Sequence, residues 1–359
     1  MEESRPIKPV PILNFPDVIN RRLLLTMSPS QIFLMSLCSE DVKDMLKKSM
    51  FKVDEVWIEF LNSNGNRRIT FLIRVRERFF NVLYLEELGV EDERLEEQKW
   101  ETRTRYEFLN DTVFFYSYPH QQASQIQKIH SYLSDLFHCD PCQLFVKFDF
   151  WFDFRLLQPG SVTKAVLADN SPALLGYDDI NGFFKNQPNI QIAVIERNFK
   201  ETAHMKMDQA LLRVPNVIVR HVKHNIPYFL SKFEGEHGLF ENAYLHDAFV
   251  SGFLKLWSQE RMENLKTLIA YQGSRRRFDP STVVEALERK KMDKDDIEGL
   301  DILKVENWAT EKRESITEYH NFQPDTFDCE NGIDVVRDSD GKRATIKISA
   351  EHFMFFVWP

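Results

Sequence analysis

The first fifty residues carry apolar positions with the spacing of three short helices. Pro16 suits a helix start, and we expect the first helix over residues 17–27 with one wide apolar stripe. Ser28 has the chemistry of an N-cap for the second helix, and Gln31 completes a capping box with it. The third helix is expected to begin near Ser39. The stripe of the first helix consists of Val18, Ile19, Leu23, Leu24 and Met27.

The second of these helices is more apolar than a surface helix should be. Residues 32–35 are four consecutive large apolar residues, which would place apolar side chains on all sides of the helix. Three short helices over about 40 residues also form only a marginal core by themselves. A second surface should therefore cover them. The rest of the chain or another protein could supply it, and the residues alone leave both possibilities open.

After residue 50 the pattern becomes that of strands and helices in alternation. Two strand-like segments, 53–60 and 68–75, flank the turn-forming residues 62–66 and predict a hairpin. Beyond it we expect a solvated acidic helix or loop over 86–99, strands over 112–118 and 144–150, and a helix over 121–137.

The second half of the chain continues this alternation. Residues 182–185 and 252–255 read alike, as Gly-Phe-Phe-Lys and Gly-Phe-Leu-Lys, and suggest a faint internal repeat of the leucine-rich-repeat type. Strands are expected over 188–195, 215–219, 265–270, 332–337, 343–348 and 353–358, with a turn at 338–341.

Composition and charge restrict the function further. The chain has 359 residues, enough for two to three domains, and a net charge of −9, which argues against a nucleic-acid partner. No secretory signal and no apolar run of membrane-spanning length occurs, and no cofactor motif is found. The four cysteines suggest a reducing compartment, so we expect a cytoplasmic or nuclear protein without a membrane partner.

The first fifty residues resemble an F-box. The resemblance rests on the apolar-Pro-acidic opening at Phe15-Pro16-Asp17, on the apolar run at 23–25, on residues 27–33 (Met-Ser-Pro-Ser-Gln-Ile-Phe) and on Ser-Leu-Cys at 36–38. Phe15 replaces the Leu that usually precedes the proline. The resemblance implies docking on a Skp-type adaptor, and through it on a cullin-type (SCF) ubiquitin ligase. By position, the implied docking residues are Leu13, Phe15, Pro16, Ile19, Leu23, Leu24, Ile32, Phe33 and Leu37.

The second half resembles the type 2 F-box associated domain that follows the F-box in a large nematode family. The resemblance rests on residues 252–257 and 264–268, on 340–346 (Asp-Gly-Lys-Arg-Ala-Thr-Ile) and on 355–358 (Phe-Phe-Val-Trp). It implies that this domain binds a target protein and that the chain is an adaptor, not an enzyme.

The expected fold is therefore a mixed α+β and α/β one. A three-helix F-box would be followed by a helix–strand alternating domain, leucine-rich-repeat-like in its middle, that ends in an antiparallel hairpin. The expected divisions are a tail at 1–9, the F-box at 10–50, an intermediate α/β region at 51–160 and the F-box associated domain at 161–359.

Two other functions remain open from the residues. Cys139 and Cys142 form a Cys-x-x-Cys motif, which a redox enzyme or half of a zinc site would use, although the order of helix and strand around it looks reversed and no second ligand pair is evident. His221 and His224 have a metal-like spacing, and Gly235 and Gly238 suggest that His237 lies in a solvated loop. A protein scaffold that acts without a ligase is the other alternative.

Overall fold

The chain divides into two compact units, Met1–Val162 and Thr163–Pro359. The first unit contains both the N-terminal helices and the region expected to follow them as a separate domain, and the division lies two residues from the expected one at 160/161. The structure is a computed structural model that describes residues 13, 15–49, 53–63, 66–76, 78–87, 97–99, 102–109, 112–140, 144–148, 153–167, 177–196, 210–273, 278–281, 283–285, 332–337 and 339–358.

The N-terminal helices form where the pattern predicts them. They are α1 (Asp17–Leu24), α2 (Pro29–Ser36) and α3 (Glu40–Ser49). The predicted capping box is confirmed, because Ser28 Oγ accepts the Gln31 N–H at 3.2 Å and Gln31 Oε1 accepts the Ser28 N–H at 2.9 Å. Helix α1 ends three residues earlier than expected.

The first unit also contains a sheet in the order β7-β1-β2-β3-β6-β5-β4. The hairpin of β1 and β2 is confirmed, with Glu55 opposite Arg74 and Ser63 opposite Asn66. The pairs β1–β7 and β3–β6 are parallel. The strands are β1 (Glu55–Ser63), β2 (Asn66–Val75), β3 (Arg78–Glu87), β4 (Glu97–Lys99), β5 (Thr102–Leu109), β6 (Thr112–Ser117) and β7 (Leu144–Phe148).

One expectation in this unit is wrong at both of its ends. The segment 86–99 was expected to be a solvated helix or loop, yet Glu86 and Glu87 end β3, and residues 97–99 form β4. Residues 88–96 of that segment lie outside the described residues. Glu86 is a strand residue because β3 pairs with both β2 and β6 at this position. Its carboxylate binds Arg68 on β2 at 2.9 Å.

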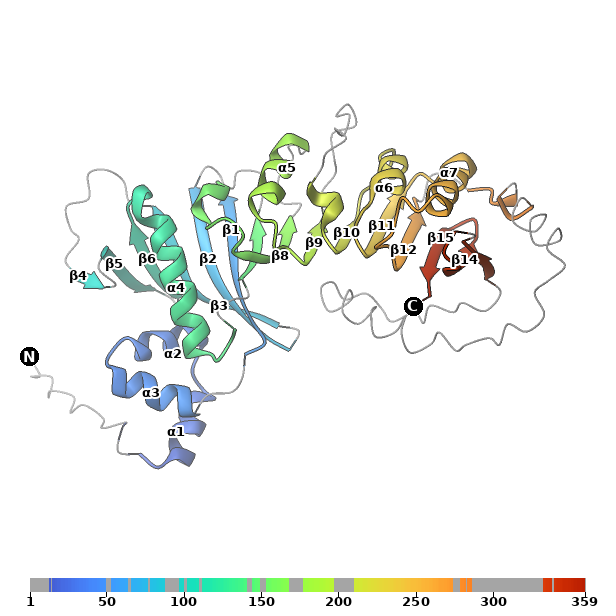
Figure 1. Cartoon of the computed structure of the whole chain (residues 1–359). Coiled ribbons are helices and arrows are strands. Elements are labelled where there is room, and N and C mark those ends of the chain that lie inside the picture. The colour runs from blue at the N-terminus through green and yellow to red at the C-terminus, as the bar shows by residue number, and fades with distance from the viewer. Residues whose placement is uncertain are drawn as a thin grey trace, which may run out of the picture. The chain divides into compact units, whose positions relative to one another are not determined.

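Helix α4 (Gln122–Leu136) contributes buried apolar side chains to the core of the first unit (Figure 1). Its inward residues Ile129, Leu133 and Leu136 are fully buried, as the predicted helical face over 121–137 requires. Short 3-10 turns lie on either side of it, η2 (Pro119–Gln121) and η3 (Phe154–Leu156).

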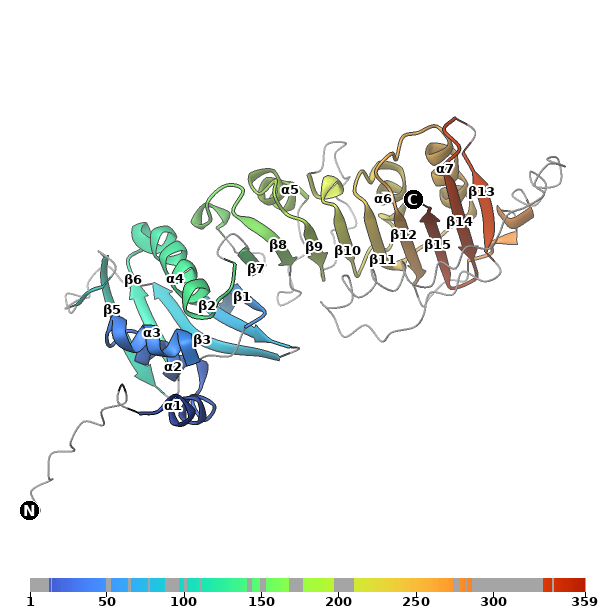
Figure 2. The ribbon, with the colours of Figure 1, turned by 60° about the horizontal axis from the view of Figure 1, so that its bottom comes forward.

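The second unit contains a sheet in the order β8-β9-β10-β11-β12-β15-β14-β13. Its first five strands are parallel, and each pairs with the next strand along the chain. Figures 1 and 2 show α5, α6 and α7 on one face of these strands. The strands are β8 (Val162–Leu167), β9 (Ile192–Ile195), β10 (Asn216–Val219), β11 (His237–Ala243), β12 (Thr267–Gln272), β13 (Ile333–Val336), β14 (Arg343–Ile348) and β15 (His352–Val357).

The helices between these strands supply much of the apolar cover. Phe183 on α5 and Phe253 on α7 occupy the same place in the two similar Gly-Phe segments, and both are buried. The two similar segments therefore lie on two helices, each of which precedes a strand of the same sheet. The helical elements are α5 (Tyr177–Asn186), η4 (Ala210–Arg213), α6 (Ile226–Lys232) and α7 (Asp247–Ser258).

The chain's last described strands are antiparallel. The predicted hairpin around residues 338–341 is confirmed, since β13 pairs with β14. Strand β15 lies between β14 and β12 and pairs antiparallel with both of them. The end of the chain is therefore joined to the edge of the parallel strands.

Candidate docking surface on the N-terminal helices

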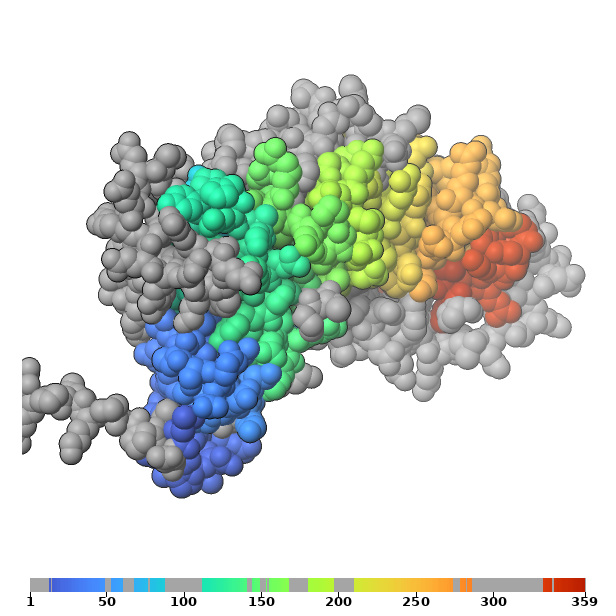
Figure 3. Space-filling view, turned by 60° about the vertical axis from the view of Figure 1, so that its left-hand side comes forward, coloured from blue at the N-terminus to red at the C-terminus, as the bar shows by residue number. Residues whose placement is uncertain are grey.

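Helix α1 and the residues beside it expose more apolar surface than any other described part of the chain. A monomeric soluble protein exposes single apolar residues routinely, but a cluster of this kind marks an interaction surface. Figure 3 shows the darkest blue segment, which contains α1, at the outer end of the first unit. The exposed fractions are 49% for Leu13, 66% for Val18, 49% for Ile19, 38% for Leu23 and 73% for Leu25.

The helix is held by only two buried residues of its own. Asn20 and Leu24, one turn apart, face inward and are 2% and 3% exposed. The Asn20 side chain donates a hydrogen bond to the Phe15 carbonyl at 3.2 Å, which ties the segment before the helix to its first turn. The remaining apolar residues of α1 therefore face outward.

The structure separates the nine predicted docking residues into an outer and an inner group. Leu13, Pro16, Ile19 and Leu23 are exposed, whereas Phe15 and Leu37 are half-buried. The inner group does not lie on the surface in this structure: the exposed fractions of Leu24, Ile32 and Phe33 are 3%, 1% and 0%.

Phe33 shows why α2 turns its apolar face inward. Its ring packs 5.8 Å from the ring of Phe115 on β6 and 5.8 Å, edge-on, from the ring of Tyr132 on α4. The apolar run at 32–35 was expected to need a covering surface. For Ile32 and Phe33, other residues of the first unit provide this cover. Both residues, which the resemblance implied as docking residues, are core residues of the first unit in this structure.

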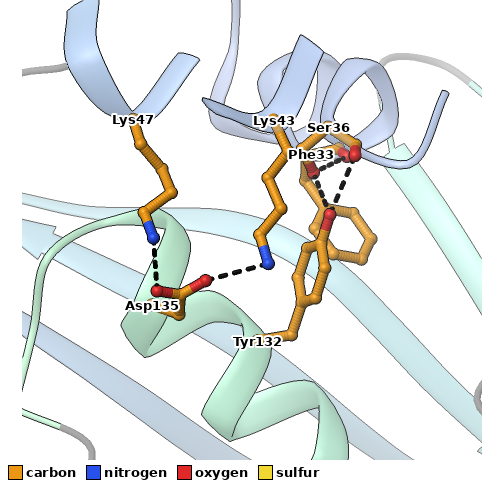
Figure 4. A network of polar contacts seen from close by, with 6 residues as sticks. All are labelled: Phe33, Ser36, Lys43, Lys47, Tyr132 and Asp135. Carbon is orange, nitrogen blue, oxygen red and sulfur yellow. Dashed lines mark hydrogen bonds and ion pairs between the residues drawn. The ribbon is translucent and has the colours of Figure 1, made fainter. Parts of the chain in front are cut away.

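A polar network fixes α2 against α4 next to this ring (Figure 4). The Tyr132 hydroxyl lies 2.9 Å from both the carbonyl oxygen and Oγ of Ser36 and donates its proton to this pair. Ser36 Oγ in turn donates to the Phe33 carbonyl at 2.6 Å. Burial raises the pKa of Tyr132 to about 12, so its hydroxyl keeps its proton, and can donate it, even at a pH where an ordinary tyrosine has lost it.

A charged network fixes α3 against the same helix (Figure 4). The Asp135 carboxylate bridges Lys43 at 2.8 Å and Lys47 at 2.6 Å, and hydrogen bonds from these lysines lower the pKa of Asp135. The Lys43 ammonium also lies 4.3 Å from the centre of the Tyr132 ring. One turn of α4 therefore holds both α2 and α3 in place and leaves α1 as the outer helix.

Raising the pH above 10 is expected to destabilise the first unit through Tyr132. The unfolded phenol loses its proton near pH 10, whereas the folded one keeps it to about 12, so the unfolded state binds fewer protons and stability falls as pH rises through this window. We expect a loss of about 1 kcal/mol by pH 11. Urea unfolding of the wild type and of Tyr132→Phe between pH 9 and 11 measures it, and equal slopes in the two proteins would contradict the assignment.

The Cys-x-x-Cys segment is described only in part. Helix α4 precedes it and β7 follows it, in the predicted reversed order. The half-buried Cys139 has its sulfur 3.5 Å from the Val53 carbonyl oxygen, while Cys142 lies outside the described residues. Within the described segments no three His, Cys, Asp or Glu side chains gather into a possible metal site.

Two histidines of the second unit, His224 and His237, are packed against neighbouring residues or buried. His224 packs edge-on against Tyr244, with ring centres 4.4 Å apart. His237 begins β11 and is 2% exposed, so the expected solvated loop around it is wrong. Gly235 and Gly238 are glycines because of close packing: a Cβ at Gly235 would lie 2.2 Å from the Val214 carbonyl oxygen.

Three residues that carry the second resemblance, Trp257, Phe355 and Asp340, lie close together with Arg337 in the second unit. Trp257 on α7 packs edge-on against Phe355 on β15, with ring centres 5.1 Å apart. Arg337, 2% exposed, lies over the Trp257 ring and binds Asp340 with two hydrogen bonds of 2.8 and 2.5 Å. Those bonds hold the pKa of Asp340 well below its usual range. These motif residues therefore close the end of the sheet.

Sequence reasoning missed two residues of the exposed surface, Val18 and Leu25, as docking residues. The signal was present in the triplet at 23–25, since three consecutive leucines on one helix cannot all face the same way.

In the described helices, none is long and apolar enough to cross a membrane. No protein-family model matches this chain, and comparison with curated proteins and with solved structures found no match.

Proposed function

We propose that the chain is the substrate-recognition adaptor of a cullin-type ubiquitin ligase, and that α1 with its flanking residues binds a Skp-type adaptor. The observation that carries the proposal is the exposure of five large apolar side chains between Leu13 and Leu25. A buried CH₂ contributes about 0.8 kcal/mol, so covering this surface is a substantial driving force for association. The resemblance of residues 13–38 to an F-box supplies the class of partner.

The division of the chain into two compact units suits such an adaptor. The first unit would hold the ligase, and the second, with its alternating strands and helices, would hold the target protein. The adaptor then works by proximity, because joining two binding units raises the local concentration of the target's lysines near the ubiquitin-loaded enzyme. No bond is made or broken by the adaptor itself.

The docking surface now differs from the one implied by the resemblance alone. It comprises Leu13, Pro16, Val18, Ile19, Leu23 and Leu25, all exposed. Phe15 and Leu37 are half-buried and are not included in it. Substituting Ile32 or Phe33 would test the stability of the first unit and not the interface, so a variant that tests the interface must change the outer residues only.

The double variant Ile19→Lys and Leu23→Lys is expected to lose capture by a purified Skp-type adaptor. Each lysine would place a charge where the complex buries apolar surface, whereas neither disturbs the free protein, because both positions are exposed. Lysine near the end of α1 also suits the helix dipole. We expect at least a hundredfold weaker binding in a pull-down or by calorimetry with the full chain.

The matched control is Val336→Lys, which charges an exposed apolar residue of the second unit. It should bind the adaptor like the wild type, and all three proteins should have the same circular dichroism spectrum and thermal midpoint. Absence of adaptor binding by the wild type, or equal binding by the double variant, would refute the proposal. Capture of the adaptor without cullin would favour a ligase-independent scaffold.

A further inference from the structure

The sheet of the second unit ends in a strand with one open edge. Strand β13 is the last strand in the order of this sheet, and among the described strands it pairs with β14 alone. Figure 2 shows it at the end of the sheet. The side chains of Ile333 and Val335 are half-buried, whereas those of Asp334 and Val336 are exposed. The function proposed above does not use this edge.

The hydrogen bonds of β13 show which backbone groups face outward. In an antiparallel pair, residues whose backbone groups bond to the partner strand alternate with residues whose groups point away from it. The Arg337 N–H donates to the Lys342 carbonyl at 2.8 Å, so the backbone of Val335 also faces β14. The N–H and C=O groups of Asp334 and Val336 therefore point outward. In the part of the chain that the structure describes, these outward groups have no hydrogen-bond partner.

This edge lacks the features that usually prevent one sheet from pairing with another. Natural edge strands carry lysine, proline or a β-bulge for this purpose. Strand β13 reads Ile-Asp-Val-Val, and its register with β14 has no shift. The carboxylate of Asp334 is held on its own sheet, because the Thr345 hydroxyl donates to it at 2.6 Å. The edge is therefore able to accept another extended strand.

The edge is complementary to a second copy of itself. An antiparallel pairing about a twofold axis at Val335 would place Asp334 of one copy opposite Val336 of the other. Both outward residues of each strand would then exchange hydrogen bonds with the partner strand. An axis at Asp334 would instead place two carboxylates side by side, which is unfavourable. An axis at Val336 would bring only that residue into a bonded pair.

The axis at Val335 also brings opposite charges together. Arg343 lies opposite Val336 on β14, on the same face of the sheet as Asp334. Arg343 of one copy would therefore lie two strand spacings, about 10 Å, from Asp334 of the other, and the two side chains can meet across the intervening Val336. Arg343 is exposed and forms no ion pair within the described segments. The complementarity belongs to this pair of side chains and does not depend on the net charge of the edge.

The other charges near β13 are engaged or lie farther from the axis. Asp340 is bound to Arg337, and the Lys342 ammonium donates to a backbone carbonyl at 3.3 Å. Lys347 on β14 is half-buried and lies farther from the axis than Asp334 does. Residue 338 of the turn lies outside the described residues. The described charges therefore leave Arg343 available to a second copy.

We propose that two copies of this chain associate by antiparallel pairing of β13 with β13 about a twofold axis at Val335. Asp334 of each copy faces Arg343 of the other. The strand is short, so the dimer is a weak one, as interfaces below about 1,200 Å² usually are. The inference does not depend on the adaptor function. If that function holds as well, each dimer presents two α1 docking surfaces.

The first test is sedimentation velocity of the full chain over a range of concentrations, in about 0.15 M salt, where distant charges are screened. We expect reversible self-association of the wild type. Val336→Pro should weaken it roughly tenfold or more, because proline removes an outward N–H and leaves the bonds to β14 intact. Val336→Thr is the matched control, since threonine keeps both the N–H and the β-branched shape, and it should associate like the wild type.

The second test exchanges the charges of the pair. Asp334→Arg and Arg343→Asp should each self-associate roughly tenfold more weakly than the wild type, because like charges then face each other. An equimolar mixture of the two variants should associate to within about threefold of the wild type, because both pairs are again of opposite charge. This recovery is specific to the proposed register.

Three results would overturn the proposal. They are a wild type that remains monomeric at millimolar concentration, undiminished association of Val336→Pro, and no gain when the two charge variants are mixed. All the variants should keep the circular dichroism spectrum of the wild type and its capture of a Skp-type adaptor. Loss of self-association with adaptor capture intact therefore separates this inference from the proposed function.

Discussion

Replacing Phe33 with alanine should lower the free energy of unfolding of the first unit by about 3–5 kcal/mol, the usual cost of removing a buried phenylalanine. The side chain is fully buried, and its loss would leave a cavity between Phe115, Tyr132 and α2. Because Ser36 Oγ bonds to the Phe33 carbonyl, displacement of α2 would also strain the Tyr132 hydrogen bonds. Urea unfolding monitored by aromatic fluorescence measures the change.

Two other substitutions separate a core role from a docking role. Phe33→Leu keeps most of the volume and should cost less than Phe33→Ala. Leu25→Ala removes an apolar residue that is 73% exposed and should change stability by no more than about 0.5 kcal/mol. If Phe33→Ala left stability unchanged and abolished adaptor binding, Phe33 would be a docking residue and the packing described for α2 would be wrong.

Replacing Gly235 with alanine is expected to destabilise the second unit by about 3 kcal/mol or more, at the upper end of overpacking effects. The added Cβ would lie 2.2 Å from the Val214 carbonyl oxygen and 2.6 Å from the Phe233 ring. Backbone at Val214 cannot move freely, because its N–H bonds to the Leu211 carbonyl at 3.2 Å. The register of β10 against β11 would have to shift, and thermal unfolding followed by circular dichroism would report it.

Gly252→Ala is the matched control, and we expect it to raise the stability that Gly235→Ala lowers. Gly252 lies on the exposed side of α7, and a Cβ there would meet nothing within 4 Å. Alanine is favoured over glycine inside a helix by about 1 kcal/mol, so Gly252→Ala should raise the thermal midpoint. A similar response of both variants would show that the close contact at Gly235 does not determine its stability.

Local signals in the sequence predicted local structure well. The capping box at Ser28 and Gln31 and the hairpins β1–β2 and β13–β14 depend on residues that lie near one another in the chain, so the sequence carries the whole signal. Helix α4 was equally clear from its apolar spacing. Strand β11 was missed because Gly235 and Gly238 look like loop residues, whereas here they allow the close approach of Val214 and Phe240.

The candidate docking surface could be predicted only in part. Both α1 and α2 are rich in apolar residues, and the sequence does not say which helix faces the sheet. That choice depends on contacts between residues about a hundred positions apart, such as Phe33 with Tyr132 and Lys43 with Asp135. Of the predicted docking residues, the two on α2, Ile32 and Phe33, are buried, and the exposed surface around α1 includes Val18 and Leu25, which were not predicted.

The order of strands in the second unit has a consequence for how such chains change over evolutionary time. From β8 to β12, strands that adjoin in the sheet also adjoin along the chain, and β15, β14 and β13 cover the final edge. Insertion or deletion of one strand with its helix leaves every other pairing intact. Gene segments that each encode one strand and its helix could therefore be duplicated or lost as whole units. The resulting paralogues would differ in length but would keep the same three antiparallel strands at the final edge.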